Sequence, residues 1–374
     1  MHLTGSLSQR ATIRALAALA GIAAVAMLTT GCSGTTGGSP SGDPSGVSLD
    51  GQRIGISVCC PVPQIDVIAN AIVDSAESND SGVDTTVVNG NSDVQKARSD
   101  IQTFLAQGYN GIWSTLISGQ GYDTIAKQAA ESGVPWVNFS GSAVTGATLN
   151  IVIPEEQLGF ALGVAAAGWM SDNGVESGSV GATIDSTGAN TKRTEGFEAG
   201  VKSVLPDVEV FTVGNAASTT TAGQAIGANL LQAHPDIAVF FGWTADDAIG
   251  LLSAAKAAGN DDPAKFLVVS PEANDQVYKL IADGSILQIA ASLGYPFGAI
   301  AGERLLEKAM TGEEIPHTAI MRPTIITPDN VELVQKQEAN PYDYPDRIDG
   351  QLAFVDQVLA FGDVPTDQVD AVTP

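Results

Sequence analysis

The chain has 374 residues, of which 44% are apolar and 16% charged, so it can bury a substantial core and has a length that fits two domains. Its 17 Lys and Arg residues against 42 Asp and Glu residues give a formal charge of -25, which argues against nucleic acid as a partner. With only three His and three Cys in the chain, we expect no His-rich metal cluster and no Cys-rich zinc module.

Residues 1–31 are typical of a secretory signal peptide. Two Arg residues precede an apolar run, residues 15–28, which is short for a membrane span but suits a signal-peptide core. The run ends in LTTGC at residues 28–32, which resembles the bacterial lipobox and implies that Cys32 is lipidated as the mature N-terminus. Because Thr29 departs from the usual Leu of that pattern, a secreted protein without a lipid anchor is the alternative.

Residues 32–50 are rich in Gly, Ser, Thr, Pro and Asp, which is typical of a flexible linker. After this linker, short apolar runs of strand length alternate with segments of helical periodicity. Such alternation predicts parallel sheets covered by helices on both faces, arranged as two Rossmann-like α/β lobes. The expected strands are Arg53–Cys60, Val83–Val88, Gly111–Leu116, Val134–Phe139 and Leu149–Ile153, then Ser179–Ile184, Val208–Val213, Ile237–Phe241, Phe266–Ser270 and Leu287–Ala291.

The sequence contains no catalytic signature. The patterns G-x-S-x-G, G-x-x-x-x-G-K-[ST], H-E-x-x-H and G-x-G-x-x-G are all absent, so we expect no enzyme, no catalytic residue and no cofactor. Asp246 and Asp247 open an expected helix, where capping explains them better than acid–base chemistry. A hydrolase or isomerase on an α/β scaffold is the rival from another class.

Three segments, residues 190–197 (NTKRTEGF), 229–237 (NLLQAHPDI) and 322–327 (RPTIIT), point to one family by their order and spacing. They resemble the ribose-binding, type I group of extracytoplasmic solute-binding proteins of ABC transporters, and the resemblance covers roughly residues 53–334. Lac-repressor-type regulators share this fold but carry a DNA-binding module where this chain has an export signal.

The resemblance implies a type I periplasmic-binding-protein fold, in which two lobes joined by a three-stranded hinge close on a sugar. We expect a first lobe of residues 51–152 and 293–322 and a second lobe of residues 153–292 and 323–334. Residues 335–374 form an acidic extension, in which apolar side chains predict an extra helix around residues 350–361.

The resemblance also implies which residues contact the ligand. Arg193, in the R-x-x-G-F pattern, is the best candidate, with a surface helix Arg as the alternative. Glu272 falls where the family has an Asp that binds adjacent hydroxyls, although it could instead cap a helix near Ala273. Four further positions carry other side chains than ribose binders do, and they are Asn138, Ser140, Thr244 and Ser292.

The loop after the first strand differs most from ribose binders, which place two aromatic residues there to stack on the sugar ring. This chain has CCPVPQID at residues 59–66, so Gln64 and Asp66 are the polar candidates. Among Trp113, Trp136 and Trp243, the last is the preferred aromatic substitute because it directly follows a strand. Ordinary packing at a sheet end is the alternative for all three, and it is favoured for Trp113.

Cys59 and Cys60 are adjacent in the chain. Outside the cytosol, oxidising conditions favour pairing, so we hypothesise a disulfide between neighbours that forms a rigid apolar platform at the cleft. Two free buried thiols are the alternative.

These observations lead us to expect a monomeric lipoprotein, anchored on the extracytoplasmic side of the cell membrane, that delivers a neutral sugar or sugar alcohol to an ABC permease and its ATPase. Pentoses and linear polyols of about four to six carbons, such as xylitol or threitol, suit the altered stacking loop. A receptor for a quorum signal or nucleoside, or a sensory subunit that presents its ligand to a kinase, remains open.

Overall fold

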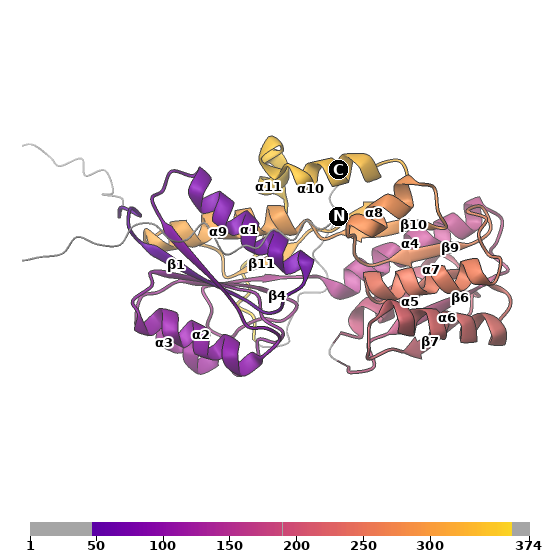
Figure 1. Cartoon of the computed structure of the whole chain (residues 1–374), viewed down its shortest axis with the longest axis horizontal. Coiled ribbons are helices and arrows are strands. Elements are labelled where there is room, and N and C mark those ends of the chain that lie inside the picture. Colours follow the sequence, from indigo (N-terminus) through magenta and orange to yellow (C-terminus); the bar gives the residue numbers. More distant parts are fainter. Residues whose placement is uncertain (1–46, 189, 361–374) are drawn as a thin grey trace, which may run out of the picture. The chain divides into compact units, whose positions relative to one another are not determined.

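The structure is a computed structural model that describes residues 47–188 and 190–360. The expected signal peptide, Cys32 and all but the last four residues of the expected linker lie outside this range. Strands and helices alternate along most of the described chain (Figure 1). Within that part of the chain, no helix combines the length and apolar character that a membrane crossing requires.

The first lobe is built on a seven-stranded sheet. Neighbouring strands are parallel except at one edge, where the last strand of the chain pairs antiparallel. In sheet order the strands are β13 (Leu352–Val355), β11 (Thr318–Met321), β5 (Leu149–Val152), β4 (Trp136–Ser140), β3 (Gly111–Ser114), β1 (Arg53–Val58) and β2 (Asp84–Asn89).

Helices cover both faces of this sheet (Figure 1). On one face, α1 (Pro63–Ser78) and α9 (Tyr295–Met310) bury Ile56 and Val137. On the other face, α2 (Val94–Ala106) and α3 (Asp123–Glu131) pack on Ile112 and Trp136. Strand side chains alternate between the two faces, so both faces of each central strand must be apolar.

The second lobe has a six-stranded sheet, parallel except for the pairing of β10 with β12. In order its strands are β12 (Thr324–Ile326), β10 (Leu287–Ser292), β9 (Leu267–Ser270), β8 (Ile237–Phe241), β6 (Ser179–Ile184) and β7 (Val210–Gly214). The helices of this lobe are α4 (Glu155–Asp172), α5 (Lys192–Val204), α6 (Thr220–Ala233), α7 (Ala245–Ala257) and α8 (Asp275–Ala282). The ten expected strands are confirmed, each within two residues at either end.

The chain passes between the two sheets after β5, after β10 and after β11. We call these three passages the first, second and third crossings. After the third crossing the chain continues through α10 (Val331–Ala339), the 3-10 turn Pro341–Asp343 and α11 (Pro345–Gly350) into β13.

The prediction of an extra helix around residues 350–361 is wrong. The chain forms strand β13 there, which pairs antiparallel with β11 at the edge of the first lobe's sheet. Ala353 and Val355 point to one face of β13 and pack against Val152 and Ile320, whereas Phe354 on the opposite face is 49% exposed. Further on, Leu359 packs against the first lobe near Val152 and Ile320.

A buried pair of carboxyl groups lies where α9 packs against α1. Glu303 Oε2 accepts hydrogen bonds from Ser75 Oγ at 2.7 Å and from Asn79 Nδ2 at 3.3 Å. Burial, together with the Glu307 carboxylate one turn along α9, raises the pKa of Glu303 from its ordinary 4.5 to about 8. Glu303 therefore holds a proton at neutral pH.

Because the folded protein binds this proton more tightly than the unfolded chain, Glu303 costs stability as pH rises from about 4.5 to about 8. We expect Glu303→Gln to raise the melting temperature by about 2 °C or more near pH 8.5 and by much less near pH 5. Melting curves across this pH range measure the difference. Glu314→Gln, which changes an exposed carboxylate, is the control, and an equal gain at both ends of the range would contradict the assignment.

Candidate functional site

Arg193 lies at the start of α5 and is 3% exposed. Its Nε and Nη2 donate to the two carboxylate oxygens of Glu155, at 2.7 and 3.1 Å. Its Nη1 donates to Glu272 Oε1 at 2.8 Å and to the backbone oxygen of Trp243 at 2.9 Å. These bonds use four of the five guanidinium N–H groups and fix the plane of the side chain.

Charge balance governs this cluster. Burial alone would lower the pKa of Arg193, but the carboxylates of Glu155 and Glu272 outweigh it and hold that pKa above its ordinary value. One guanidinium between two carboxylates leaves a net charge of -1. The cluster offers oxygen acceptors at Glu272, whose side chain is 22% exposed.

Glycines on α4 and α5 bring Glu155 and Arg193 together. A Cβ on Gly159 would lie 1.9 Å from the backbone oxygen of Arg193, and one on Gly196 would lie 2.1 Å from that of Glu156. Only glycine permits such close backbone contact. The pattern repeats one turn further, where Gly163 and Gly200 meet the facing backbone in the same way.

The cluster sits at the carboxyl edge of the second lobe's sheet, where ligands bind in open parallel sheets. Trp243 follows β8 and Glu272 follows β9. The Trp243 side chain is partly exposed, and its Nε1 donates to the backbone oxygen of Asn215 at 3.1 Å. Next to it, Thr244 is the N-cap of α7 and shares a 2.8 Å hydrogen bond with Ser218.

Asp247, in the first turn of α7, is fully buried. Burial raises its pKa to about 6, although hydrogen bonds from Thr183 and Asn215 act in the opposite direction. The α7 cap is provided by Thr244, so neither Asp246 nor Asp247 is the N-cap residue.

Asn138 and Ser140 lie at the carboxyl end of β4 in the first lobe. The Asn138 amide is fully buried and donates to the Ser142 backbone and to Asn150 Oδ1. The Ser140 hydroxyl donates to the Leu116 backbone and accepts from Ser142. Their polar groups order the loop after β4, and the structure does not present them on the surface.

Cys59 and Cys60 follow β1. Their sulfur atoms are joined as a disulfide between neighbouring residues. Cys59 is buried and Cys60 partly exposed, and the Cys59 amide donates to Thr115 Oγ1 at 3.0 Å. Asp66, in the first turn of α1, is exposed.

Gln64 lines a cavity of about 520 Å³, a volume typical of ligand pockets. Its walls come from both lobes and include Tyr295 at the start of α9, Tyr278 on α8 and Glu338 on α10. Burial raises the pKa of Tyr295 well above its ordinary value, and the nearby Glu272 raises it further, against the effect of Arg193. The charges of Glu272 and Arg193 therefore both affect the pKa of the Tyr295 phenol.

Glu338 accepts hydrogen bonds from Tyr278 Oη, at 2.7 Å, and from Ser292 Oγ. Ser292 is 2% exposed and also accepts from the Gly294 amide at 3.0 Å. The expected ligand residue Ser292 is thus covered, and the group beside it on the cavity wall is Glu338.

Sequence reasoning missed Glu155, Tyr295 and Glu338. For Glu155 a signal was present, because G-x-x-x-G occurs on both α4 and α5, one turn after Glu155 and after Arg193 respectively.

Of the three Trp residues considered as stacking partners, Trp113 and Trp136 are 0% and 1% exposed, which agrees with the alternative that they pack in the core. Trp243 is the one that is partly exposed.

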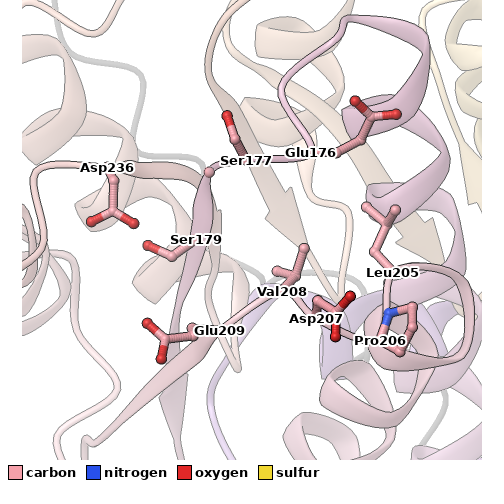
Figure 2. A pocket seen from close by; sticks show the side chains of 10 residues that line it. Glu176, Ser177, Ser179, Leu205, Pro206, Asp207, Val208, Glu209 and Asp236 are labelled. Carbon is pink, nitrogen blue, oxygen red and sulfur yellow. The ribbon is translucent and has the colours of Figure 1, made fainter.

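A separate pocket of about 500 Å³ lies at the opposite, amino ends of β6 and β7 (Figure 2). Figure 2 shows Ser179 between Asp236 and Glu209, and Glu176 and Asp207 also contribute carboxylates. This pocket is far along the strands from Arg193 and from the sheet edge where such folds bind ligands. Across residues 47–188 and 190–360, no group of His, Cys, Asp and Glu side chains is arranged to hold a metal ion.

Comparisons with known proteins agree with this geometry. The model of the periplasmic binding protein domain matches residues 65–314. The ribose import binding protein RbsB of Bacillus subtilis (strain 168) is 25% identical over 257 residues, which are 68% of this chain and 79% of that protein.

Solved structures share this fold. A Mycobacterium smegmatis protein in complex with β-D-fucofuranose has a TM-score of 0.66 at 19% identity, covering 81% of this chain and 99% of that one. A solute-binding protein of an ABC transporter from Bacillus halodurans C-125, with bound myo-inositol, has a TM-score of 0.63 at 15% identity, covering 77% and 99%.

The relatives are binding proteins of ABC transporters, so the expectation of a binding protein rather than an enzyme is confirmed. The chain belongs to the periplasmic binding protein domain family and has the two-lobed type I fold of the sugar-binding proteins that serve ABC importers.

Proposed function

We propose that the protein captures one small, neutral, hydroxyl-rich solute, a pentose or a sugar alcohol of four to six carbons such as xylitol or threitol, and delivers it to an ABC permease. The observation that carries this proposal is the Arg193 cluster, in which protein groups take four of the five guanidinium donors. What remains for a ligand is one Nη2 N–H and the free lone pairs of two carboxylates.

Such a site selects ligands that donate hydrogen bonds. A hydroxyl can donate to Glu272 and accept from Arg193 at once, and vicinal hydroxyls match a carboxylate with two bonds. A phosphorylated sugar would meet a net charge of -1 and a strongly acidic chain. The ligand range of the relatives, which includes fucofuranose and myo-inositol, supports the same class.

We further propose that Cys32 carries the lipid anchor, that the mature protein is a monomer on the extracytoplasmic side of the cell membrane, and that residues 32–50 form its tether. The support is the apolar run before Cys32 and the Gly- and Ser-rich composition after it. The solute contacts would come from Arg193, Glu272, Trp243 and Gln64, with Glu155, Tyr295 and Glu338 added from the structure.

A thermal-shift screen of the chain from residue 33 onward tests the function. The panel contains D-ribose, D-allose, xylitol, threitol and myo-inositol, with ribose 5-phosphate and adenosine as comparisons. A true ligand at about 100 times its Kd adds roughly 2.7 kcal/mol to the folded state and raises the melting temperature by several degrees. Shifts confined to the phosphate or the nucleoside would overturn the proposal, as would chemical conversion of the bound compound.

Replacing Arg193 tests the site. Arg193→Lys keeps the charge but loses the planar fork, so we expect at least a tenfold weaker Kd for the compound that shifts the wild type. Glu155→Gln removes one charged partner of a nearly buried guanidinium, and we expect the Kd to rise about tenfold by isothermal titration calorimetry. The matched control is Glu156→Gln, whose side chain is 43% exposed and pairs with Lys192. If Glu155→Gln and Glu156→Gln bind equally well, Glu155 has no part in the site.

Counting thiols tests the proposed redox state of the β1 loop. In the chain from residue 33 onward, Cys59 and Cys60 are the only cysteines. After denaturation, a thiol reagent should label neither of them before reduction and both of them after reduction. Cys60→Ser, as a control, should show one thiol in both states. Two reactive thiols in unreduced wild-type protein would contradict the disulfide and, with it, the proposed rigid apolar platform.

A further inference from the structure

The segment after the third crossing contacts both lobes. Helix α10 packs against α8 of the second lobe, and β13 then pairs with β11 in the first lobe's sheet. The chain therefore returns once more from one sheet to the other after the three crossings. This segment, residues 331–355, lies beyond the residues that match the family model.

One residue of this segment joins two crossings. Gln351 is fully buried, and its Nε2 donates to the backbone oxygens of Leu293, at 3.3 Å, and Arg322, at 2.9 Å. Leu293 belongs to the second crossing and Arg322 to the third. In return, the Arg322 amide donates to the Gln351 backbone oxygen at 3.0 Å.

The second crossing is shaped to accept this side chain. Gly294 has a φ of 62°, in the left-handed region, and a Cβ there would lie 2.4 Å from Gln351 Oε1. Glycine therefore serves both the backbone conformation and the space for Gln351.

Two further contacts attach the segment to the crossings. Glu338 accepts from Ser292, directly before the second crossing, and from Tyr278 of the second lobe. Arg347 Nη2 donates to Thr324 Oγ1, directly after the third crossing, at 3.1 Å. The segment thus holds both crossings by side-chain hydrogen bonds, of which those from Gln351 to Leu293 and from Arg347 to Thr324 are buried.

We propose that residues 331–355 form a brace across the hinge, in which Gln351 is the positioning residue that limits how far the second and third crossings can rotate. Movement of the lobes requires backbone dihedral changes at these crossings. Any such change must strain or break the Gln351 bonds and would leave buried carbonyl groups without donors. The effect of the brace on sugar affinity rests on the proposed function, whereas its effect on the hinge does not.

The test compares Gln351→Met with Gln335→Met in the otherwise intact protein. Methionine keeps nearly the volume of glutamine but donates no hydrogen bond, and Gln335 is an exposed glutamine on α10. Hydrogen–deuterium exchange of the ligand-free protein is measured on peptides covering residues 292–295 and 322–325, with β8 as the core reference.

We expect Gln351→Met to speed exchange at both crossings by about tenfold or more, while β8 and the Gln335→Met protein behave as wild type. Crossing-specific exchange separates a positioning role from a general loss of stability, which would also speed β8. Unchanged exchange at the crossings would overturn the proposal. If Gln351→Met does not fold, Gly294→Ala is the second variant, because its Cβ displaces the Gln351 side chain. It must then speed hydrogen–deuterium exchange at Arg322 without speeding exchange in β8.

Sugar binding provides the second arm. By lowering the fraction of binding-competent protein, loss of the brace should weaken the Kd of the pentose or sugar alcohol that the wild type binds in the thermal-shift panel, by about threefold to tenfold. If no pentose or sugar alcohol of the panel binds the wild type, the proposed ligand class fails, and the exchange arm alone decides whether the brace exists.

Discussion

The structure depends on one buried guanidinium. A charge with 3% exposure is tolerated only when fixed acceptors surround it, and Arg193 obtains them from Glu155, Glu272 and the Trp243 backbone. Two of these acceptors follow strands of the same sheet, but Glu155 begins a different helix. Its position depends on the glycine-to-backbone contact of α4 with α5, so close helix packing determines the geometry of the site.

The sheets could be predicted from sequence because strands buried on both faces leave a continuous apolar run, as in β8, where Ile237–Phe241 are all buried. The resemblance to ribose binders pointed to Arg193 and Glu272, and the structure brings these two side chains together in one ion pair. Glu155 could not be assigned in this way, since it stands 38 residues from Arg193 and a carboxylate at a helix start is already explained by the helix dipole. Its role depends on a helix–helix contact.

The carboxyl-terminal segment shows where local pattern misleads. Over so short a run, the apolar residues near Phe354 suit a helix as well as a strand. They form a strand because β11 has a free edge with which they pair. Likewise, Glu338 reaches Ser292 across 46 residues, through a helix that lies beyond the matched family residues. Such long-range pairings leave no periodic signal, so sequence analysis placed the segment in an extension without assigning it contacts.

The proposed ligand-contacting residues and the crossings are adjacent in the chain, so the proposed recognition would be tied to lobe movement. Glu155 starts α4 directly after the first crossing, and Tyr295 starts α9 directly after the second. Tyr295 lines the cavity from the first lobe's helix α9, and Glu272 of the second lobe raises the pKa of its phenol. A solute that binds Glu272 and lies against Tyr295 therefore adds contacts across the same crossings that Gln351 restrains. Under these proposals, affinity would depend on hinge stiffness as well as on the hydrogen bonds of the cluster.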